Sequence, residues 1–348
     1  NLSIDSLNVF YESILEADKI IEYCMLDNFK DKTIVITGGS GYIGASLIEE
    51  LRGQAKRVIC VSRKKIIQHK DVEVWKLDLQ KSSSWNQILR ESDVIFHLGG
   101  NTSVYDAEQN PEESLISTLY PIVHMINAAR KLSLVPRVIF ASTATVYGLT
   151  DILPVSELTE PNPITIYDLH KLFAEQYLMM ASKNKIINST SLRLANVYGP
   201  SYSESSSEER GIVNTITKKA LYGNELKIFG DGNYMRDYIY IDDVTSALIH
   251  TANSHNTTSK TFNVSSQVGV KVKEVIELIA SKASVIIEKQ IIVNQVKWPK
   301  GANDIEKRNF IGNSNALYTA TEWEPKTTLT QGITKTINFY WKQMNNHT

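Results

Sequence analysis

Cysteine is scarce in this chain, which holds only Cys24 and Cys60 among its 348 residues. Two cysteines without metal-type spacing argue against a disulfide framework and against a zinc site. Proteins that work in a reducing compartment typically lack disulfides. The cysteine usage therefore favours a cytoplasmic location and predicts no metal centre.

An excess of one charge and long apolar runs are also missing. Lys and Arg number 37 and Asp and Glu number 38, which gives a net charge of −1. No apolar run approaches the ~20 residues that a membrane-spanning helix needs, and the first residues lack the layout of a signal peptide. We therefore expect neither a nucleic acid nor a membrane as a partner.

What the chain does contain is an alternation of two patterns over its first 200 residues. Short β-branched runs alternate with helix-like segments, which is typical of βαβ units around a parallel sheet. The strand-like runs lie at 33–37, 57–62, 72–79, 93–98, 137–142 and 190–195, and the helical segments at 42–52, 82–91, 111–132 and 165–182. The pattern predicts an α/β protein with a doubly wound parallel sheet.

Both ends of the chain depart from this alternation. Residues 1–28 form an N-terminal extension with apolar side chains at helical spacing, and we expect an extra amphipathic helix there. These side chains are Leu7, Phe10, Ile14, Ala17 and Ile21. After residue 200 we expect a polar loop at 201–210, strands at 226–229, 237–241 and 261–264, and helices at 212–222, 242–252 and 271–282.

The stretch TGGSGYIG, residues 37–44, follows a predicted strand and opens a predicted helix. Its glycines Gly38, Gly41 and Gly44 allow a tight turn and let backbone N–H groups approach a pyrophosphate. The positive end of the following helix favours the same anion. In this setting a dinucleotide phosphate site is favoured over an ordinary turn.

The Gly-x-x-Gly-x-x-Gly spacing and the motifs that follow it resemble the extended short-chain dehydrogenase/reductases that act on nucleotide sugars. The resemblance covers about residues 30–340. Its further markers are KLDL (76–79), FHLGG (96–100), STATVYG (142–148), Tyr167-x-x-x-Lys171, RLANVYGP (193–200), GDGNYMRDYIYIDDV (230–244), FNVSS (262–266) and WEP (323–325). It implies a NAD(P)-binding Rossmann domain over 29–195, to which 237–265 returns, and a smaller C-terminal nucleotide-sugar-binding lobe over 196–236 and 266–348.

The helix after Pro111 departs from the family pattern. Thr118 stands where the family usually has Asn, and Pro121 stands where it often has Gly. We expect Pro121 to kink this helix. Related enzymes commonly dimerise by packing this helix and the Tyr167–Lys171 helix into a four-helix bundle, so the resemblance implies a homodimer.

Thr143, Tyr167 and Lys171 are the predicted catalytic residues. Tyr167 and Lys171 are four residues apart and share one face of a helix. A nearby ammonium favours the phenolate and lowers the pKa of the tyrosine, which suits it to proton exchange near neutral pH. In the family the lysine also binds the nicotinamide ribose, and a hydroxyl at the position of Thr143, rather than Ser142, holds the substrate oxygen.

The expected cofactor is a nicotinamide dinucleotide. NAD(H) enzymes often carry an acid about 20 residues after the glycines, and this chain has Ser62 there, followed by Arg63. Because Arg and a hydroxyl can bind a 2′-phosphate, NADP(H) is favoured, with NAD(H) possible. The predicted cofactor-binding residues are Gly38, Gly41, Tyr42, Ile43, Gly44, Ser62, Arg63, Lys64, Asp78, Leu79, Leu98, Gly99, Gly100, Tyr167 and Lys171.

Asn196 and Arg236 match family positions that contact the diphosphate of the nucleotide sugar. Arginine suits this role because it forms bidentate, charge-assisted hydrogen bonds. With Thr143 they make up the predicted substrate site, whereas Arg308 lies in a region that aligns poorly and stays outside the prediction. His170 is expected to face solvent.

The residues after Thr143 narrow the reaction. The family's 4,6-dehydratases carry Asp-Glu there, where this chain has Ala144 and Thr145, so water elimination lacks its acid and base. The epimerase-reductases that make GDP-fucose use a cysteine in the same strand, and neither cysteine of this chain is near it. Two reactions at the sugar C4 are left, reduction of a 4-keto sugar and 4-epimerisation.

STATVYG resembles the epimerases more, whereas SRKK (62–65) suits a dissociable NADPH. We expect a 4-keto-sugar reductase, with a 4-epimerase that retains NAD as the alternative. A non-catalytic NADP(H)-binding sensor is a third interpretation, and the presence of both Tyr167 and Lys171 argues against it.

Overall fold

The computed structural model describes residues 28–63, 69–202 and 211–346. The predicted N-terminal helix, most of the polar loop 201–210 and Lys64 lie outside these residues.

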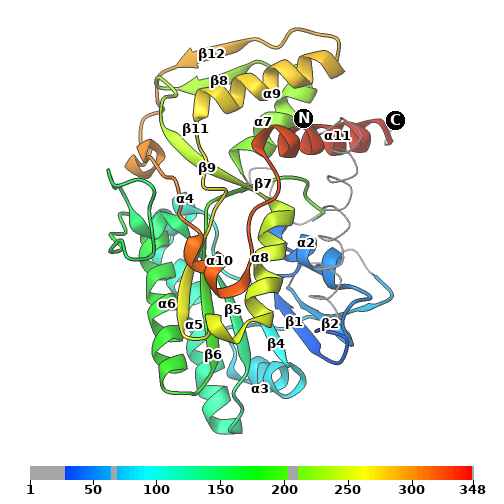
Figure 1. Ribbon diagram of the computed structural model, residues 1–348, viewed down its shortest axis with the longest axis vertical. Helices are drawn as coiled ribbons and strands as arrows, with labels where there is room; N and C mark the ends of the chain where they lie inside the picture. The colour runs from blue at the N-terminus through cyan, green and yellow to red at the C-terminus, as the bar shows by residue number, and fades with distance from the viewer. Residues whose placement is uncertain (1–27, 64–68, 203–210, 347–348) are drawn as a thin grey trace, which may run out of the picture.

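A seven-stranded parallel sheet forms the centre of the larger part of the molecule (Figure 1). Its order is β10-β6-β5-β4-β1-β2-β3, and every neighbouring pair is parallel. The strands are β1 (Thr33–Thr37), β2 (Arg57–Val61), β3 (Val72–Trp75), β4 (Val94–His97), β5 (Arg137–Thr143), β6 (Asn188–Leu194) and β10 (Lys260–Val264). The order reverses between β1 and β4, which confirms the predicted doubly wound sheet.

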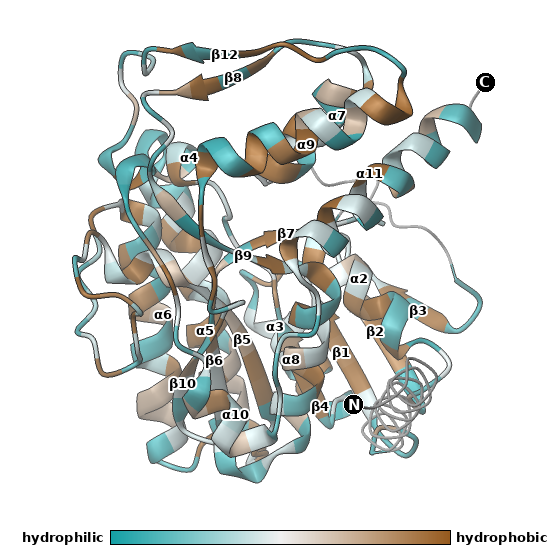
Figure 2. Ribbon diagram, turned by 45° about the horizontal axis from the view of Figure 1, so that its top comes forward, coloured by the Kyte–Doolittle hydropathy of each residue, from teal (hydrophilic) through white to brown (hydrophobic). Residues whose placement is uncertain are grey.

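Helices cover both faces of this sheet. The helices α2 (Tyr42–Leu51) and α8 (Ile241–Asn253) pack on one face, and α3 (Ser82–Glu91), α5 (Pro111–Leu132) and α6 (Ile166–Lys183) pack on the other. In β1, Ile34 and Ile36 join the first core and Val35 joins the second. Because successive strand residues point to opposite faces, the unbroken apolar runs seen in Figure 2 are buried on both sides.

A smaller lobe has its own hydrophobic core. Strand β9 (Met235–Tyr240) lies between β11 (Gly269–Lys271) and β7 (Asn196–Tyr198), and β8 (Leu226–Phe229) pairs with β12 (Val293–Val296). Its helices are α7 (Ile212–Leu221), α9 (Val272–Ile286) and α11 (Leu329–Asn346). Within the segment 237–265, β10 joins the main sheet and α8 packs on it. Strand β9 pairs with β7 and β11 instead.

Shorter elements complete the described fold. They are α4 (Val104–Gln109), α10 (Asn315–Thr321) and the 3-10 turns η1 (Ala144–Tyr147), η2 (His255–Thr257) and η3 (Asp304–Lys307). Helix α5 continues through Pro121, which is buried inside it. Within the described ranges, no helix has both the length and the apolar character that crossing a bilayer requires.

Candidate active site

Two neighbouring cavities lie at the carboxyl ends of the main-sheet strands. The glycine cleft, of about 750 Å³, is lined by the ends of β1, β2 and β4 and by one side of α5. The central cavity, of about 860 Å³, runs between the end of β5, the start of α6 and the smaller lobe. Thr102 lines both, so the two spaces adjoin. This edge is where doubly wound sheets bind their ligands.

The glycine loop follows β1 where the strand order reverses. Gly38 has a φ of +69°, and a Cβ there would lie 2.7 Å from the backbone nitrogen of Gly99. A Cβ at Gly44 would lie 2.4 Å from the carbonyl oxygen of Gly38. These positions therefore require glycine. Helix α2 begins directly after Gly41, which lines the cleft, so the positive end of its dipole faces a ligand there.

Most of the predicted cofactor-binding residues line the glycine cleft. They are Gly38, Gly41, Ser62, Arg63, Asp78, Leu79, Leu98, Gly99 and Gly100. Tyr42 and Ile43 lie toward the smaller lobe: the Tyr42 hydroxyl donates to the carbonyl oxygen of Gly199 at 3.0 Å, and Ile43 packs between two cores. A loop too tight for side chains, beside a helix N-terminus, fits the pyrophosphate of a dinucleotide.

The position expected to hold an acid in NAD(H) enzymes carries a hydroxyl. Ser62 donates a hydrogen bond to the hydroxyl oxygen of Ser40 at 2.6 Å, and both serines line the cleft beside the exposed Arg63. Ser40 was not among the predicted residues. Its place inside the glycine loop was the signal that could have identified it.

Thr143 and Tyr167 line the central cavity, and Lys171 lies buried behind them. The Lys171 ammonium donates to the carbonyl oxygen of Ala141 at 2.8 Å and lies 6.0 Å from the centre of the Tyr167 ring. Burial lowers the pKa of Lys171 to about 8, and the carboxylate of Glu175 acts in the opposite direction. The fold thus brings the three predicted catalytic residues together.

The hydroxyl of Thr143 belongs to a hydrogen-bonded chain. Its Oγ1 lies 2.7 Å from Oγ1 of Thr145, and Thr145 donates to the carboxyl group of Asp168. Asp168 is fully buried. Its position directly after Tyr167 was visible in the sequence, but no motif marked the carboxyl group as a neighbour of Thr143.

Two guanidinium groups give one part of the central cavity a positive charge, and the neutral amide of Asn196 lies beside them. Arg236 donates to the backbone carbonyl oxygens of Arg308 and, at 2.6 Å, of Glu306. Arg308 donates to Oδ1 of Asn196 at 3.1 Å. In the part of the chain that the structure describes, neither arginine forms an ion pair with a carboxylate. Burial lowers the pKa of Arg236 to about 10, with the charge of Arg308 acting in the same direction.

Arg308 lines the same cavity but was not among the residues predicted from the sequence. It follows η3, in a stretch with neither strand nor helix periodicity, so pattern reasoning could not place it. The fold places it beside Arg236, and two adjacent cations without a carboxylate partner among the described residues favour a bound polyanion.

Aromatic side chains line another part of the central cavity. The rings of Phe229 and Trp298 stack with centres 5.6 Å apart, and Tyr234 meets Trp298 edge-on at 6.1 Å. The buried Nε1 of Trp298 has no hydrogen-bond partner among the described residues. None of the three was predicted from the sequence, because they come from separate segments that only the fold assembles.

The prediction that His170 faces solvent is wrong. It is buried, and its Nδ1 lies 3.0 Å from the hydroxyl of Ser114 on α5. The sequence of α6 alone does not show that α5 covers this face. His97 is also buried, with Nδ1 2.7 Å from the Thr37 hydroxyl, and burial, aided by the charge of Lys171, lowers its pKa to about 3.

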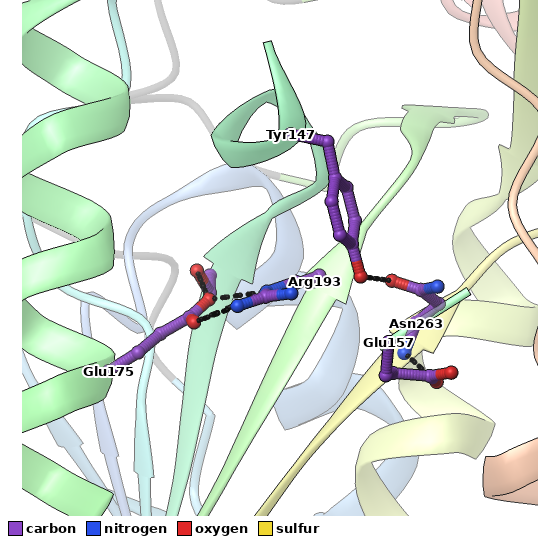
Figure 3. A network of polar contacts seen from close by, with 6 residues as sticks. Tyr147, Glu157, Glu175, Arg193 and Asn263 are labelled. Atoms are coloured by element: carbon purple, nitrogen blue, oxygen red, sulfur yellow. Dashed lines mark hydrogen bonds and ion pairs between the residues drawn. The ribbon is translucent and has the colours of Figure 1, made fainter. Parts of the chain in front are cut away.

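A buried polar network lies beside β5 (Figure 3). Glu175 on α6 pairs with Arg193 on β6 at 2.7 Å and accepts a hydrogen bond from Ser142 at 2.5 Å. The Arg193 guanidinium lies 4.7 Å from the centre of the Tyr147 ring, and the Tyr147 hydroxyl donates to Oδ1 of Asn263 at 2.8 Å. The network ties α6, which carries Tyr167 and Lys171, to three strands of the sheet.

The sheet, the glycine cleft and the Thr–Tyr–Lys arrangement define an NAD(P)-dependent enzyme of the extended short-chain dehydrogenase/reductase type. Residues 34–265 match the NAD dependent epimerase/dehydratase family, and the chain belongs to this family.

Named relatives cover nearly the whole chain. A UDP-glucose 4-epimerase from Mycolicibacterium smegmatis is 28% identical over 316 residues, 88% of this chain and 97% of the relative. UDP-glucuronic acid decarboxylase 1 from Xenopus tropicalis is 25% identical over 324 residues, 90% of this chain and 73% of the relative. The crystal structure of UDP-glucose 4-epimerase with UDP-glucose from Thermotoga maritima is 26% identical, with a TM-score of 0.79, and the match covers 90% of this chain and 99% of that chain.

Proposed function

We propose that the protein is a nucleotide-sugar 4-epimerase. One observation carries this proposal: Thr143 and Tyr167 face the same cavity as Arg236 and Arg308. A single ligand can therefore reach the hydroxyl groups with its sugar and the cations with a diphosphate. Two relatives named UDP-glucose 4-epimerase, at 28% and 26% identity, support this reaction. The order expected from the sequence, with the reductase first, is thereby reversed.

The glycine cleft is the proposed cofactor site. The backbone around Gly38 and Gly41, with the N-terminus of α2, would hold the pyrophosphate. A nicotinamide dinucleotide bound there supplies the acceptor and the donor of hydride for C4. The residues of the chain bind and orient the sugar and move the proton of its 4-hydroxyl group.

Tyr167 is the proposed acid–base residue. It takes the proton of the 4-hydroxyl when C4 is oxidised and returns a proton to the same oxygen when C4 is reduced. The Lys171 ammonium, 6.0 Å from the Tyr167 ring centre, favours the phenolate. The Thr143 hydroxyl holds the same substrate oxygen by a hydrogen bond.

Arg236, Arg308 and Asn196 are the proposed diphosphate ligands. Guanidinium groups bind phosphate oxygens through charge-assisted, often bidentate, hydrogen bonds. The stacked Phe229 and Trp298 line the same cavity and offer flat apolar surface to a nucleobase. The substrate class that fits all three parts of the cavity is a nucleoside diphosphate sugar.

The residues after Thr143 disfavour dehydration. Ala144 is buried and Thr145 carries a hydroxyl, so neither brings a carboxyl group to the sugar. Asp168 stands behind Thr145 and does not line the cavity. Acid–base chemistry beyond C4 therefore has no carboxyl group at the positions that the family's dehydratases use.

A specific observation keeps a second candidate, a 4-keto-sugar reductase that uses NADP(H). Ser62 and Arg63 line the glycine cleft where an acid would bind the NAD(H) ribose. Arg63→Ala should then lower NADP(H) affinity about 10- to 100-fold and leave NAD(H) affinity unchanged. A wild-type protein that already prefers NAD(H) would remove the reductase from consideration.

Turnover with cofactor accounting separates the two candidates. The protein is incubated with UDP-glucose or UDP-N-acetylglucosamine without reductant, and separately with NADPH and a 4-keto nucleotide sugar. An epimerase forms the C4 epimer with no net change in cofactor, whereas a reductase consumes one NADPH for each 4-keto sugar. The Tyr167→Phe variant serves as the inactive reference. A wild-type protein that binds a dinucleotide but is as inactive as this variant on all of these substrates would contradict both candidates and favour the sensor.

We also propose a homodimer formed through α5 and α6. Phe173, Tyr177 and Met180 lie at spacings of four and three on the exposed side of α6, and Tyr120 is exposed on α5. The two helices pack against each other within the protomer. Exposed apolar side chains on two neighbouring helices are typical of a protein interface.

A further inference from the structure

The Asp168 carboxyl group has two hydrogen-bond donors from two different elements. The Thr165 hydroxyl donates to Oδ2 at 2.6 Å, and the Thr145 hydroxyl in η1 donates to Oδ1. Asp168 is fully buried and does not line the central cavity. It reaches the cavity only through Thr145 and Thr143, which both line it.

Helix capping brings Thr165 next to Asp168 and so accounts for the first of these contacts. Thr165 is the N-cap of α6, and its Oγ1 accepts from the backbone nitrogen of Asp168 at 3.2 Å. A capping residue does not need a bond to a neighbouring segment. The contact with Thr145 is therefore not needed for capping. Through Thr145 it connects Asp168 to Thr143, the residue that we assign to the substrate oxygen.

An ionised Asp168 fixes the direction of this chain. A carboxylate only accepts hydrogen bonds, so Thr145 must donate to it. Thr145 Oγ1 then accepts from Thr143, 2.7 Å away, and Thr143 Oγ1 also accepts from the backbone nitrogen of Thr145 at 3.2 Å. Thr143 has donated its only proton, and a lone pair is left for a ligand. It can accept a hydrogen bond from a sugar hydroxyl, but it cannot donate one.

A protonated Asp168 reverses the chain. The carboxylic acid donates to Thr145, Thr145 donates to Thr143, and Thr143 is free to donate to a carbonyl oxygen. Burial raises the pKa of Asp168 above its ordinary value, although the hydrogen bonds from Thr145 and Thr165 act in the opposite direction. The nearby charges oppose one another: Arg308 favours the carboxylate, and Glu108 on α4 disfavours it.

Resting on the proposed function, we propose that Asp168 is a positioning residue that sets the direction of the Thr143–Thr145 hydrogen bonds. With Asp168 ionised, Thr143 accepts from the 4-hydroxyl of the sugar. With Asp168 protonated, Thr143 donates to the 4-keto oxygen. The hydroxyl protons only change the neighbour to which they point, and the proton on Asp168 comes from solvent.

Two substitutions alter the hydrogen bonds between Asp168, Thr145 and Thr143 in distinct ways. In Asp168→Asn, the Thr165 hydroxyl still donates to the amide oxygen, so the amide NH₂ group faces Thr145 and holds the chain in its reversed direction. Thr145→Val removes the hydroxyl that connects Asp168 to Thr143. We expect Asp168→Asn to lower kcat/KM for a nucleotide sugar about 10- to 100-fold. Both variants should lose the acidic limb of the wild-type pH profile of kcat/KM, which a merely structural role would not remove.

The matched control is Thr165→Val, which removes the other hydroxyl from the same carboxyl group. It leaves Thr143, Thr145 and Asp168 connected. Because a hydrogen bond that stabilises the carboxylate is lost, the acidic limb should move to higher pH and persist. Thermal unfolding identifies any loss of folding among the variants, and Thr145→Val provides the test if Asp168→Asn fails to fold.

A second readout is independent of turnover. The full-length protein is labelled with ¹³C in its aspartate carboxyl groups, and the NMR resonance absent from Asp168→Asn is followed against pH. Its midpoint should coincide with the wild-type acidic limb and rise in Thr145→Val. Turnover with an acidic limb unchanged in both variants would overturn the proposal and leave the epimerase intact. Absence of turnover in the wild type would instead overturn the proposed function, and an Asp168 midpoint unmoved by Thr145→Val would overturn the hydrogen-bonded chain itself.

Discussion

At the scale of single residues, the hydroxyl groups of the site face the central cavity, whereas its ammonium group is buried behind them. Tyr167 and Thr143 face the central cavity, where they can touch a sugar. Lys171 is buried behind them and held on the carbonyl oxygen of Ala141. In the proposed mechanism this cation acts through the electrostatic potential at the Tyr167 phenol, which is strong because little water screens it.

Removal of the phenol oxygen tests the role of Tyr167. Tyr167→Phe keeps the ring but deletes the acid–base group, so turnover should fall ~10²–10⁴-fold. Dinucleotide affinity, measured by fluorescence titration, should change little. Tyr177→Phe on the exposed side of the same helix is the control and should keep full activity. A Tyr167→Phe variant with near-normal turnover would exclude this residue as the acid–base group.

The buried ammonium of Lys171 predicts a pH dependence of stability. Its pKa is about 8 in the folded protein against 10.5 for the ordinary side chain. Between these values the unfolded chain holds a proton that the folded chain has lost, so the free energy of unfolding rises with pH by up to about 1.4 kcal/mol per unit. Below pH 8 both states are protonated, and this dependence vanishes.

Urea unfolding of the wild type and of Lys171→Met isolates that contribution, because groups common to both proteins cancel. The wild type should gain stability relative to the variant from pH 8 to pH 10.5. A difference that stays constant over this range would show that Lys171 keeps an ordinary pKa.

At the scale of elements, α6 must be fixed on the sheet because it carries Tyr167 and Lys171. The Glu175–Arg193 pair provides this link between α6 and β6 (Figure 3). Both side chains are buried, at 4% and 7% exposure. Glu175→Ala would leave an unpaired buried guanidinium, and the free energy of unfolding should fall by ~3–5 kcal/mol.

An exposed ion pair serves as the control for this prediction. Glu73 pairs with Arg57 at 2.9 Å and is 48% exposed. Because solvent screens such pairs, Glu73→Ala should cost at most ~1 kcal/mol in the same urea titration. Equal losses in Glu73→Ala and Glu175→Ala would contradict a special role for the buried pair.

The elements also show which features of the fold a sequence reveals. The strands and helices of the main sheet have strong periodicity and clear turn signals, and predicted segments such as 33–37, 82–91 and 111–132 match β1, α3 and α5 in the structure. β7 and β11 have three residues each, too few to establish a period of two. Their position depends on pairing with β9, whose residues lie about thirty or more positions away in the sequence.

The candidate site divides in the same way. The glycine loop and the Tyr–Lys pair are local patterns, so the sequence could indicate them. Arg308 and Asp168 acquire partners only when distant segments meet, the first beside Asn196 and the second beside Thr145. The prediction for His170 was wrong for the same reason, because Ser114, the residue of α5 that contacts it, lies 56 residues away in the chain.

At the scale of the whole molecule, the α5–α6 surface predicts assembly. Placing a charge at the centre of its apolar stripe, as in Tyr177→Glu, should convert a dimer into a monomer at micromolar concentration, because a buried unpaired carboxylate strongly destabilises an interface. Sedimentation measures the change. Tyr222→Glu, at a residue 68% exposed at the end of α7, is the control and should stay dimeric. A monomeric wild type would contradict the proposed interface.

The whole molecule places a glycine cleft beside a cavity that offers acid–base groups, cations and aromatic rings to one ligand. The central claim is that this arrangement removes a hydrogen from C4 of a nucleotide sugar and returns it to C4. The most direct measurement follows deuterium in UDP-glucose labelled at C4, incubated with the protein in ordinary water. The account predicts a C4 epimer that keeps deuterium at C4, with no external reductant consumed. A product that loses the label from C4, or the absence of any epimer while the cofactor is bound, would contradict it.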